Sequence, residues 1–456
     1  MKIQLKNILF SEKIATPFRW GLVLIIKLFF THIEFLTGLS RQDNRRVETE
    51  SSRIPVKSLW GRNMNLMYCL LISFALILPD AAKAQKDFSH VPGIVVAYRP
   101  ASDKIYLGTP SICILPDGRY VCSLNEFGKN TNMTLIFESL DKGKNWSKIS
   151  EFNGKQHGLF FHNSTLYAMG VDQSYGNCVI RKSSDKGHSW TTPTDSGNGL
   201  LRMGDAEKGY HTSSVSVVIA NDRIWRPVEV ARKRGKWGDF ESLVMSVPID
   251  ADLLNSENWK TSTRMALDVS WGNQYGTWLE GGAVISPKGE IINILRVDNR
   301  AEETAALIRV SDNGELLSFD HEKDFIRFPG GCKKFNVRYD KYSKRYWSLS
   351  NWIPKEFKGH NIERTRNTLA LISSPDLRNW TVHSVILQDD NVEKSGFQYV
   401  DWQFENDDII FLSRTAFFDG ENYADNQHNS NFITFHRIED FRNQEHLVLK
   451  NIKNIR

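Results

Sequence analysis

The chain has 456 residues, of which 41% are hydrophobic and 24% are charged, and its formal net charge is +5 at pH 7. This balance gives no reason to expect a nucleic-acid partner, which would require a strongly basic surface. Four cysteines follow residue 84, at positions 113, 122, 178 and 332, and none has the C-x-x-C spacing of zinc or redox sites. Cys113 and Cys122 could form a disulfide bond in an exported protein, but small buried thiols are the favoured interpretation.

The first 84 residues have the pattern of a leader sequence. Residues 69–78 form an apolar run that is too short to span a bilayer, and Ala82 and Ala84 supply the small-x-small pattern of a signal-peptidase site. We therefore expect a signal peptide at residues 64–84. Residues 1–63 are then expected to be an extension upstream of the true start.

Residues 85–456 are expected to form one exported domain, periplasmic or extracellular, with no membrane span. The alternative is a membrane anchor at residues 20–39. Lys27, His32 and Glu34 interrupt that stretch, and burial in a membrane disfavours such residues.

An eight-residue turn pattern, S-x-D-x-G-x-x-W, recurs along the domain. Residues 139–146 and 183–190 carry it in full, residues 373–380 carry a degraded copy, and residues 310–314 carry its front half. Ser and Asp side chains can hydrogen-bond the turn backbone, Gly supplies a positive φ, and Trp covers the turn from one side. The unit resembles the Asp-box, or BNR repeat, of sialidases and related β-propellers. Its recurrence predicts a blade repeat.

The fold expected from this pattern is all-β. The two full copies are 44 residues apart, the length of one blade, and the sequence between turns consists of short apolar or alternating runs. No long amphipathic helix is predicted, which disfavours a parallel α/β fold. We expect a single β-propeller of four-stranded antiparallel blades, with seven favoured and six also compatible. Residues 432–438 should close the ring beside residues 94–98.

One hairpin and one strand resemble the catalytic segments of sialidases. Glu280 and Arg296 stand sixteen residues apart on the two arms of a hairpin, and Tyr399 lies in the run G-F-Q-Y-V-D-W. In sialidase chemistry a Glu increases the basicity of a Tyr that attacks the anomeric carbon. The resemblance implies that Glu280 and Tyr399 are partners and that Arg296 binds a carboxylate. The alternative is structural: Glu280 satisfies a turn and Tyr399 fills the sheet.

The rest of the sialidase pattern is missing. Gly108 or Thr109 stands where the first carboxylate-binding arginine is expected, and the loop at residues 127–132 contains no aspartate to act as the acid. Arginines grip a carboxylate through paired hydrogen bonds, so the loss of one is significant. An exo-sialidase is therefore kept only as an alternative.

A closer resemblance covers most of the domain. Residues 106–121 (YLGTPSICILPDGRYV), 209–211 (GYH), 328–340 and 431–438 (NFITFHRI) carry it. These segments resemble the seven-bladed propeller family that acts on L-rhamnose-α-1,4-D-glucuronate caps of arabinogalactan-type glycans. The resemblance implies a secreted lyase or hydrolase that acts on a carbohydrate with an acidic sugar. The family pattern also places a catalytic His where this chain has Leu124, which cannot transfer a proton.

Other residues could supply the chemistry that Leu124 cannot. Elimination at a uronate requires cationic groups that neutralise the carboxylate and a base that removes the C5 proton. His211 and His428 are candidate bases. The candidate cationic groups, besides Arg296, are Arg226, Arg338 and Arg414. The alternative for each is an ordinary ion pair or a satisfied imidazole.

The sequence predicts no required cofactor. Asp425, Asn426 and Asn429 are weak candidates for calcium, because carboxylate and amide oxygens suit that ion. We expect an exported monomer that acts on terminal rhamnose–glucuronate linkages, or on a related acidic glycan, by elimination or hydrolysis. The alternatives are a catalytically inactive glycan-binding propeller and an exo-sialidase.

Overall fold

The computed structural model describes residues 86–215, 217–299 and 301–446. The expected extension at residues 1–63 and the expected signal peptide at 64–84 lie outside the described residues. Contacts divide the chain after Gln85, and the second unit begins at Lys86. Within the described ranges, no helix is long and apolar enough to cross a membrane.

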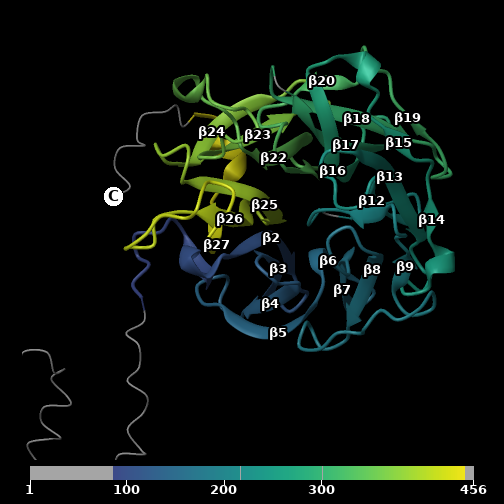
Figure 1. The fold of residues 1–456 in the computed structure, drawn as a ribbon, viewed down its shortest axis with the longest axis horizontal. Coiled ribbons are helices and arrows are strands. Elements are labelled where there is room, and N and C mark those ends of the chain that lie inside the picture. The colour runs from purple at the N-terminus through teal and green to yellow at the C-terminus, as the bar shows by residue number, and fades with distance from the viewer. Residues whose placement is uncertain (1–85, 216, 300, 447–456) are drawn as a thin grey trace, which may run out of the picture. The chain divides into compact units, whose positions relative to one another are not determined.

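The described residues form six antiparallel sheets arranged as the blades of a propeller (Figure 1). We number the blades in chain order, and in each blade the first strand is the inner one. Blade 1 contains β2 (Ile105–Ile114), β3 (Tyr120–Gly128), β4 (Met133–Ser139) and β5 (Ser147–Asn153). Blade 2 contains β6 (Lys155–His162), β7 (Thr165–Val171), β8 (Cys178–Ser183) and β9 (Leu200–Arg202).

Blades 3 and 4 carry extra short strands at their outer side or beside the inner strand. Blade 3 contains β10 (Gly209–His211), β11 (Val218–Ala220), β12 (Arg223–Ala231), β13 (Phe240–Pro248), β14 (Lys260–Thr261) and β15 (Met265–Ala266). Blade 4 contains β16 (Tyr275–Ile285), β17 (Ile291–Asn299), β18 (Thr304–Val310), β19 (Leu317–Ser318) and β20 (Phe325–Arg327).

The first strand of the described residues completes the last blade and closes the ring. Blade 5 contains β21 (Asn336–Asp340), β22 (Arg345–Ser350), β23 (Thr368–Ser374) and β24 (Thr381–Gln388). Blade 6 contains β25 (Gly396–Glu405), β26 (Asp408–Ala416), β27 (Phe432–Ile438) and β1 (Ile94–Tyr98). Antiparallel pairing of Ile94 with Phe435 and of Tyr98 with Phe432 confirms the predicted closure.

The all-β prediction is confirmed, with six blades in place of the favoured seven. The turn motifs at Asp185 and Asp312 belong to blades 2 and 4, so the 127 residues between them span two blade steps, where the repeat length had suggested three. The extra residues lie in blade 3, in β11, β15 and the long connections between its strands. The helices of the described part are short 3₁₀ turns: η1 (Ala101–Asp103), η2 (Ser256–Asn258), η3 (Val269–Trp271), η4 (Lys355–Phe357) and η5 (Phe441–His446).

The repeated turn joins the third and fourth strands of a blade. In blade 2, Ser183 Oγ accepts a hydrogen bond from Gly187 N at 2.7 Å and donates one to Asp185 Oδ1 at 2.8 Å. Trp190 Nε1 donates to Gly187 O at 3.1 Å. Blade 1 repeats these three bonds. Each motif therefore supplies hydrogen-bond partners to the backbone of its own turn, and its role is structural.

The degraded copy in blade 5 differs from its predicted alignment. Ser374, and not Ser373, donates to Asp376 Oδ1, at 3.0 Å, so the turn is one residue shorter. Leu377 takes the place of the glycine with φ of 67°. Trp380 Nε1 still donates to Leu377 O at 2.9 Å, and the cover over the turn is kept.

The hydrophobic core lies between neighbouring blades. One cluster joins blades 2 and 3, another joins blades 4 and 5, and a third joins blade 1 to blade 6. All four cysteines of the described chain are free and buried. This agrees with the buried-thiol interpretation of Cys113 and Cys122.

We predict that Ser183→Ala destabilises the protein by about 1–3 kcal/mol, because it removes the acceptor of a buried backbone N–H. Ser184→Ala is the matched control, since Ser184 is the exposed neighbour in the same turn. Chemical denaturation measures both free energies of unfolding. Equal values for the two variants would contradict the assigned role of the turn.

Candidate functional site

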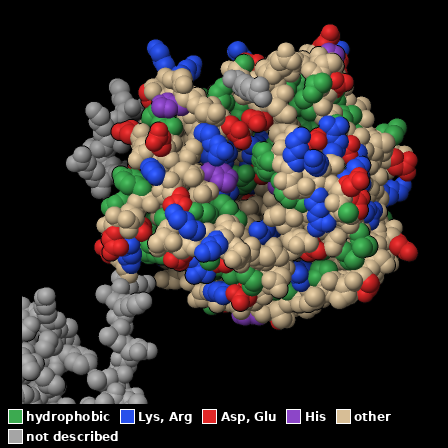
Figure 2. Space-filling view, in the orientation of Figure 1, with side chains coloured by type: hydrophobic (Ala, Val, Ile, Leu, Met, Phe, Trp, Pro, Cys, Tyr) green, Lys and Arg blue, Asp and Glu red, His purple; other side chains and the backbone are tan. Residues whose placement is uncertain are grey.

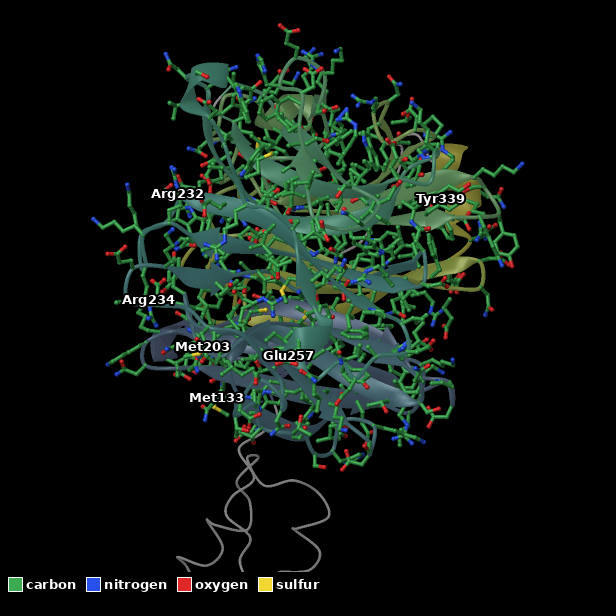
Figure 3. All side chains as sticks on the ribbon, turned by 90° about the vertical axis from the view of Figure 1, so that its right-hand side faces the viewer. Met133, Met203, Arg232, Arg234, Glu257 and Tyr339 are labelled. Atoms are coloured by element: carbon green, nitrogen blue, oxygen red, sulfur yellow. The ribbon has the colours of Figure 1, made fainter. Side chains whose placement is uncertain are left out.

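One end of the propeller carries the connections between the second and third strands of the blades. Arg232 and Arg234 belong to the connection in blade 3, and they project on the side opposite Tyr339 of blade 5 (Figure 3). We call this the site end. Figure 2 shows a face that is hollowed near its centre, with Lys and Arg side chains gathered around the hollow.

The inner strands are distorted where they approach the site end. In four of them a bulge holds a non-glycine residue at positive φ: Thr109 (48°), Gln156 (60°), Glu280 (56°) and Tyr399 (53°). Such backbone costs on the order of 1–3 kcal/mol per residue and recurs at ligand sites. Glu280 and Tyr399, chosen from the sequence, are two of these four residues.

Glu280 forms a buried ion pair with Arg296. Glu280 Oε2 lies 2.9 Å from Arg296 NH1, and both side chains are at most 2% exposed. The register that pairs Leu279 with Arg296 places the two groups together across the β16–β17 hairpin. Arg296 NH2 also reaches Glu363 Oε1 at 3.3 Å, and the acidic neighbours raise the pKa of Arg296 despite its burial. The resemblance to sialidases pairs Glu280 with Tyr399 and assigns Arg296 to a ligand carboxylate, whereas here Arg296 binds the carboxylate of Glu280.

Tyr399 lies among arginine side chains. The guanidinium carbons of Arg414 and Arg366 lie 4.7 and 5.8 Å from the centre of its ring. Burial raises the pKa of Tyr399, Glu280 raises it further, and the arginines act in the opposite direction. The phenol is thus protonated at neutral pH and lies within electrostatic range of Glu280.

Arg414 and Arg366 are buried cations that form no ion pair with a carboxylate of the described residues. Arg414 NH2 donates to His428 O at 2.5 Å, and its Nε donates to Ser430 Oγ at 3.2 Å. Arg366 NH1 donates to Gln398 Oε1 at 2.5 Å. Burial lowers the pKa of Arg414 to about 9. A buried charge without a counter-ion is costly, so an anionic ligand would be stabilised here.

The side chain of Arg414 lies beside the position of the missing first arginine. A Cβ on Gly108 would lie 3.5 Å from Arg414 NH1, an ordinary contact distance, and 3.0 Å from the Phe127 ring. Three buried arginines consequently surround Tyr399: Arg296, Arg366 and Arg414. Sequence reasoning missed Arg366, because it stands in the irregular 351–367 connection and has no strand pattern. Its position just before a buried strand was the available signal.

His211 is brought to the same cluster from blade 3. Its Nε2 lies 4.0 Å from Glu280 Oε1 and has no hydrogen-bond partner among the described residues, while Nδ1 contacts Gln156 Nε2 at 3.3 Å. Burial lowers the pKa of His211 to about 4, so the imidazole is neutral at neutral pH. Because Gln156 Nε2 can only donate, Nδ1 accepts in this arrangement, and the hydrogen of the neutral ring lies on Nε2, toward Glu280.

His428, the second candidate base, lies on the other side of the arginines. Its Nδ1 is 3.2 Å from Arg414 NH2 and 3.0 Å from Asn429 Oδ1. Burial and then Arg414 lower its pKa well below the ordinary value. His428 is thus a partner of Arg414 and has less freedom to act as a base than His211.

Arg226 and Arg338 were chosen from the sequence but lie outside the Tyr399 cluster. Arg226 is buried on β12 and donates to Ser213 O at 2.8 Å. Arg338 lies on β21, where NH2 is 3.4 Å from Asp401 Oδ1 and the guanidinium carbon is 5.5 Å from the Trp402 ring centre. Strand position alone could not tell which end of the propeller an arginine would face.

Leu124 does not face the site. It is fully buried in the apolar cluster between blades 1 and 6, beside residues such as Leu135 and Ile433. A histidine at this position would lie in that apolar core. The position therefore gives no reason to consider the site inactive.

The oxygen atoms of the calcium candidates are used within the protein. Asp425 forms an ion pair with Lys104 at 2.8 Å and accepts from the Tyr106 hydroxyl. Asn426 Oδ1 accepts from the backbone N–H groups of His428 and Asn429, both at 2.9 Å. No cluster of three or more His, Cys, Asp or Glu side chains with metal-site geometry occurs in the described ranges. Calcium stays a prediction.

A further carboxyl group, which sequence reasoning missed, supports the Glu280 bulge from behind. Glu229 Oε1 accepts the Gly281 N–H at 3.0 Å. Burial raises the pKa of Glu229 to about 8, so it is mostly protonated at neutral pH. Its bond to the residue after Glu280 holds the strained backbone in place.

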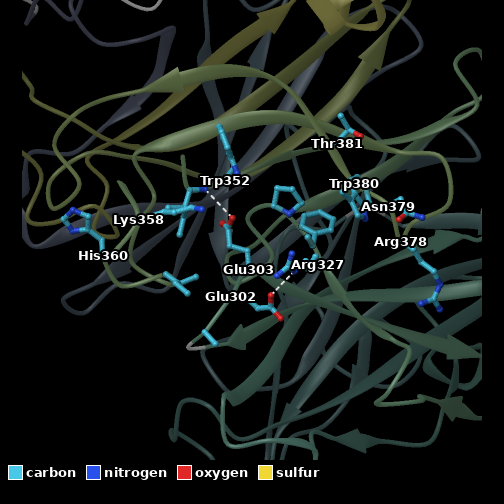
Figure 4. Close-up of a pocket in the computed structure, with 16 residues that line it drawn as sticks. Glu302, Glu303, Arg327, Trp352, Lys358, His360, Arg378, Asn379, Trp380 and Thr381 are labelled. Carbon is cyan, nitrogen blue, oxygen red and sulfur yellow. Dashed lines mark hydrogen bonds and ion pairs between the residues drawn. The ribbon is translucent and has the colours of Figure 1, made fainter. Parts of the chain in front are cut away.

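A separate groove is lined by residues of blades 4 and 5 (Figure 4). Its volume is about 710 Å³, and Trp352 and Trp380 contribute to its lining. Within it Arg327 pairs with Glu302 at 3.0 Å. Its cations are thus partly neutralised by neighbours, unlike Arg366 and Arg414.

Solved structures with a similar fold share little sequence with this chain. A protein of unknown function from Dyadobacter fermentans DSM 18053 has a TM-score of 0.52 and 15% identity, with 78% of this chain and 99% of that chain covered. A Penicillium chrysogenum α-L-arabinanase, complexed with arabinobiose, has a TM-score of 0.50 and 12% identity, covering 76% and 97%. The Hadza microbial sialidase Hz136 has a TM-score of 0.52 and 10% identity, covering 76% and 68%. This chain shares their fold.

No protein-family model and no curated protein sequence matches the chain. Identities this low relate the folds and do not carry an activity across. The chemistry must therefore be argued from the Tyr399 cluster itself.

We predict that Leu124→His destabilises the protein by about 2–4 kcal/mol and confers no new activity, because it places an imidazole in an apolar core. Leu140→His is the control, since Leu140 is 71% exposed in a turn. Thermal or chemical denaturation of both variants checks this. A stable, more active Leu124→His protein would show that position 124 faces the site.

The neutral state of His211 can be tested through the pH dependence of stability. Its folded-state pKa of about 4 lies below the unfolded value, so the unfolded chain binds the proton first and stability falls as pH drops below about 6.5. His211→Gln should reduce the stability lost between pH 7 and pH 5 by about 2 kcal/mol. His188→Gln, at an exposed turn position, is the control variant. Equal curves for His211→Gln and the wild type would show that burial does not hold this imidazole neutral.

Proposed function

We propose that the protein cleaves acidic glycans, by elimination across the linkage between terminal L-rhamnose and D-glucuronate of arabinogalactan-type chains. The observation that carries the proposal is the pair of buried arginines, Arg366 and Arg414, without carboxylate partners among the described residues. The resemblance to the rhamnose–glucuronate family supports the choice of sugar. The fold shared with an arabinanase and a sialidase supports a carbohydrate substrate.

Each step of the elimination has a residue suited to it. Arg366 and Arg414 bind the uronate carboxylate and neutralise its charge, which acidifies the C5 proton. Nε2 of neutral His211 takes that proton in the tautomer with its hydrogen on Nδ1, for which the Gln156 side-chain amide must turn its oxygen toward Nδ1. The electron pair of the C5–H bond forms the C4–C5 double bond as the C4–O bond breaks. The Tyr399 hydroxyl, protonated at neutral pH, gives its proton to the departing rhamnose oxygen.

Hydrolysis through Tyr399 is the second candidate, favoured by the electrostatic coupling of Tyr399 to Glu280. That route needs a separate acid for the leaving group. In the described part of the cluster, Glu280 and Glu363 are engaged with Arg296, and Glu229 lies behind the backbone. Elimination uses the groups that are free.

Incubation with rhamnose-capped arabinogalactan separates the candidates. Free rhamnose together with the ultraviolet absorbance of an unsaturated uronate supports elimination, and free rhamnose without it supports hydrolysis. Binding measured by calorimetry with no product supports a non-catalytic glycan-binding propeller. Release of sialic acid from a fluorogenic sialoside would replace the proposal with a sialidase.

We predict that Tyr399→Phe lowers kcat by about 10²–10⁴-fold with little change in KM, because it removes a proton donor and keeps the ring over which the arginines lie. Arg366→Gln should instead raise KM about 10–100-fold, through loss of charge-assisted bonds to the carboxylate. Arg338→Gln is the matched control and should leave both constants unchanged. A loss of activity from Arg338→Gln equal to that from Arg366→Gln would overturn the assignment of the carboxylate site.

A further inference from the structure

An aromatic wall stands beside His211 at the site end. It is formed by Tyr175, His211, Trp237 and Phe240. The Trp237 ring meets His211 edge-on at 5.7 Å and Phe240 edge-on at 5.4 Å. Tyr175 stacks on Phe240 at 6.4 Å with an interplanar angle of 5°. The contacts hold the rings in a fixed order from blade 2 to the β12–β13 connection.

The side chain of Trp237 is open to solvent. It is 48% exposed and is the one exposed tryptophan of the described residues. Exposing an indole forgoes the free energy that burying it would release. Together with the rings that it contacts, the exposed indole offers an aromatic surface to solvent.

The connection that carries Trp237 is anchored at several points. Arg232 N donates to Asp239 O at 2.9 Å, and Arg232 Nε donates to Asp239 Oδ1 at 2.6 Å. Arg234 NH1 donates to Asp205 O at 2.9 Å. The indole is therefore presented at a set position, and less ordering entropy is lost on binding.

The wall lies across the axis from the carboxylate-binding arginines. Trp237 and His211 belong to blade 3, whereas Arg414 belongs to blade 6, and these blades are opposite each other in a ring of six. The Nε2 atom of His211 lies 4.0 Å from Glu280 Oε1 of blade 4, between these two blades in chain order. A ligand whose carboxylate meets Arg414 would thus extend its neighbouring sugar toward Trp237.

We propose that this aromatic wall is a second subsite, which binds the apolar face of a neutral sugar ring linked to the acidic sugar. The inference rests on the proposed function, because it takes Arg366 and Arg414 as the carboxylate site. Sugar rings expose C–H groups on one face, and these pack on an aromatic face while the hydroxyls stay solvated. The wall would thereby select a glycan chain over a free uronic acid.

The test compares two ligands in a background in which Tyr399→Phe slows turnover. Calorimetry on Tyr399→Phe and Tyr399→Phe/Trp237→Ala would use free glucuronic acid and the rhamnosyl-glucuronate disaccharide. We expect Trp237→Ala to weaken disaccharide binding about fivefold to tenfold and to leave binding of glucuronic acid unchanged. Trp237→Phe should recover part of the loss. Tyr342→Ala, at an exposed aromatic position on the β21–β22 turn, is the control and should change neither affinity.

The outcomes separate the subsite from the function on which it rests. Unchanged disaccharide binding in Trp237→Ala, or an equal loss for both ligands, would overturn the subsite. Trp237→Ala could weaken binding of the disaccharide alone while Arg366→Gln changes the affinity for neither ligand. That result would support the subsite and overturn the carboxylate site. Selective capture of a protein partner by wild type but not by Trp237→Ala, with sugar binding unchanged, would show a docking role and overturn the subsite.

Discussion

The inner edges of six sheets face one another around the axis, and their backbone polar groups must find partners there. The carboxylate of Asp401 in blade 6 is a hydrogen-bond acceptor for several of these groups. It accepts hydrogen bonds from Ser111 Oγ at 2.8 Å, Ile112 N at 3.0 Å and Asn336 Nδ2 at 2.8 Å. Ser111 Oγ in turn accepts from Leu159 N of blade 2 at 3.0 Å. One buried carboxylate therefore links four blades. Leaving such groups unpaired would cost about 1–3 kcal/mol each.

The candidate site is built on the same inner edges, where they leave regular pairing. At the bulges the strands turn Gln156, Glu280 and Tyr399 toward the site end in strained backbone conformations. Glu229 fixes one of these bulges through Gly281. The rest of each strand stays paired in its blade, so a rigid scaffold supports the strain. This arrangement suits groups that must be held in place before a ligand arrives.

The charged groups show how far sequence reasoning could go. Glu280 and Arg296 were found because a hairpin brings positions on its two arms together at short range, and register makes that contact predictable. Arg366 was missed, and Arg338 lies outside the Tyr399 cluster, because their surroundings depend on loops and on which end of the blade each strand presents. Leu124 was given a functional meaning that its place in the apolar core between two blades does not support.

The sequence by itself determined the local architecture: the turns, the all-β class and the strands that close the ring. Each repeated turn satisfies its own hydrogen bonds within eight residues, so no distant contact is needed to specify it. Only the tertiary structure decided the number of blades and the meeting of the three arginines with Tyr399. Those contacts join segments far apart in sequence, as Ser111 and Asp401 are, 290 residues apart. Ring closure, and not any local pattern, brings them to one axis.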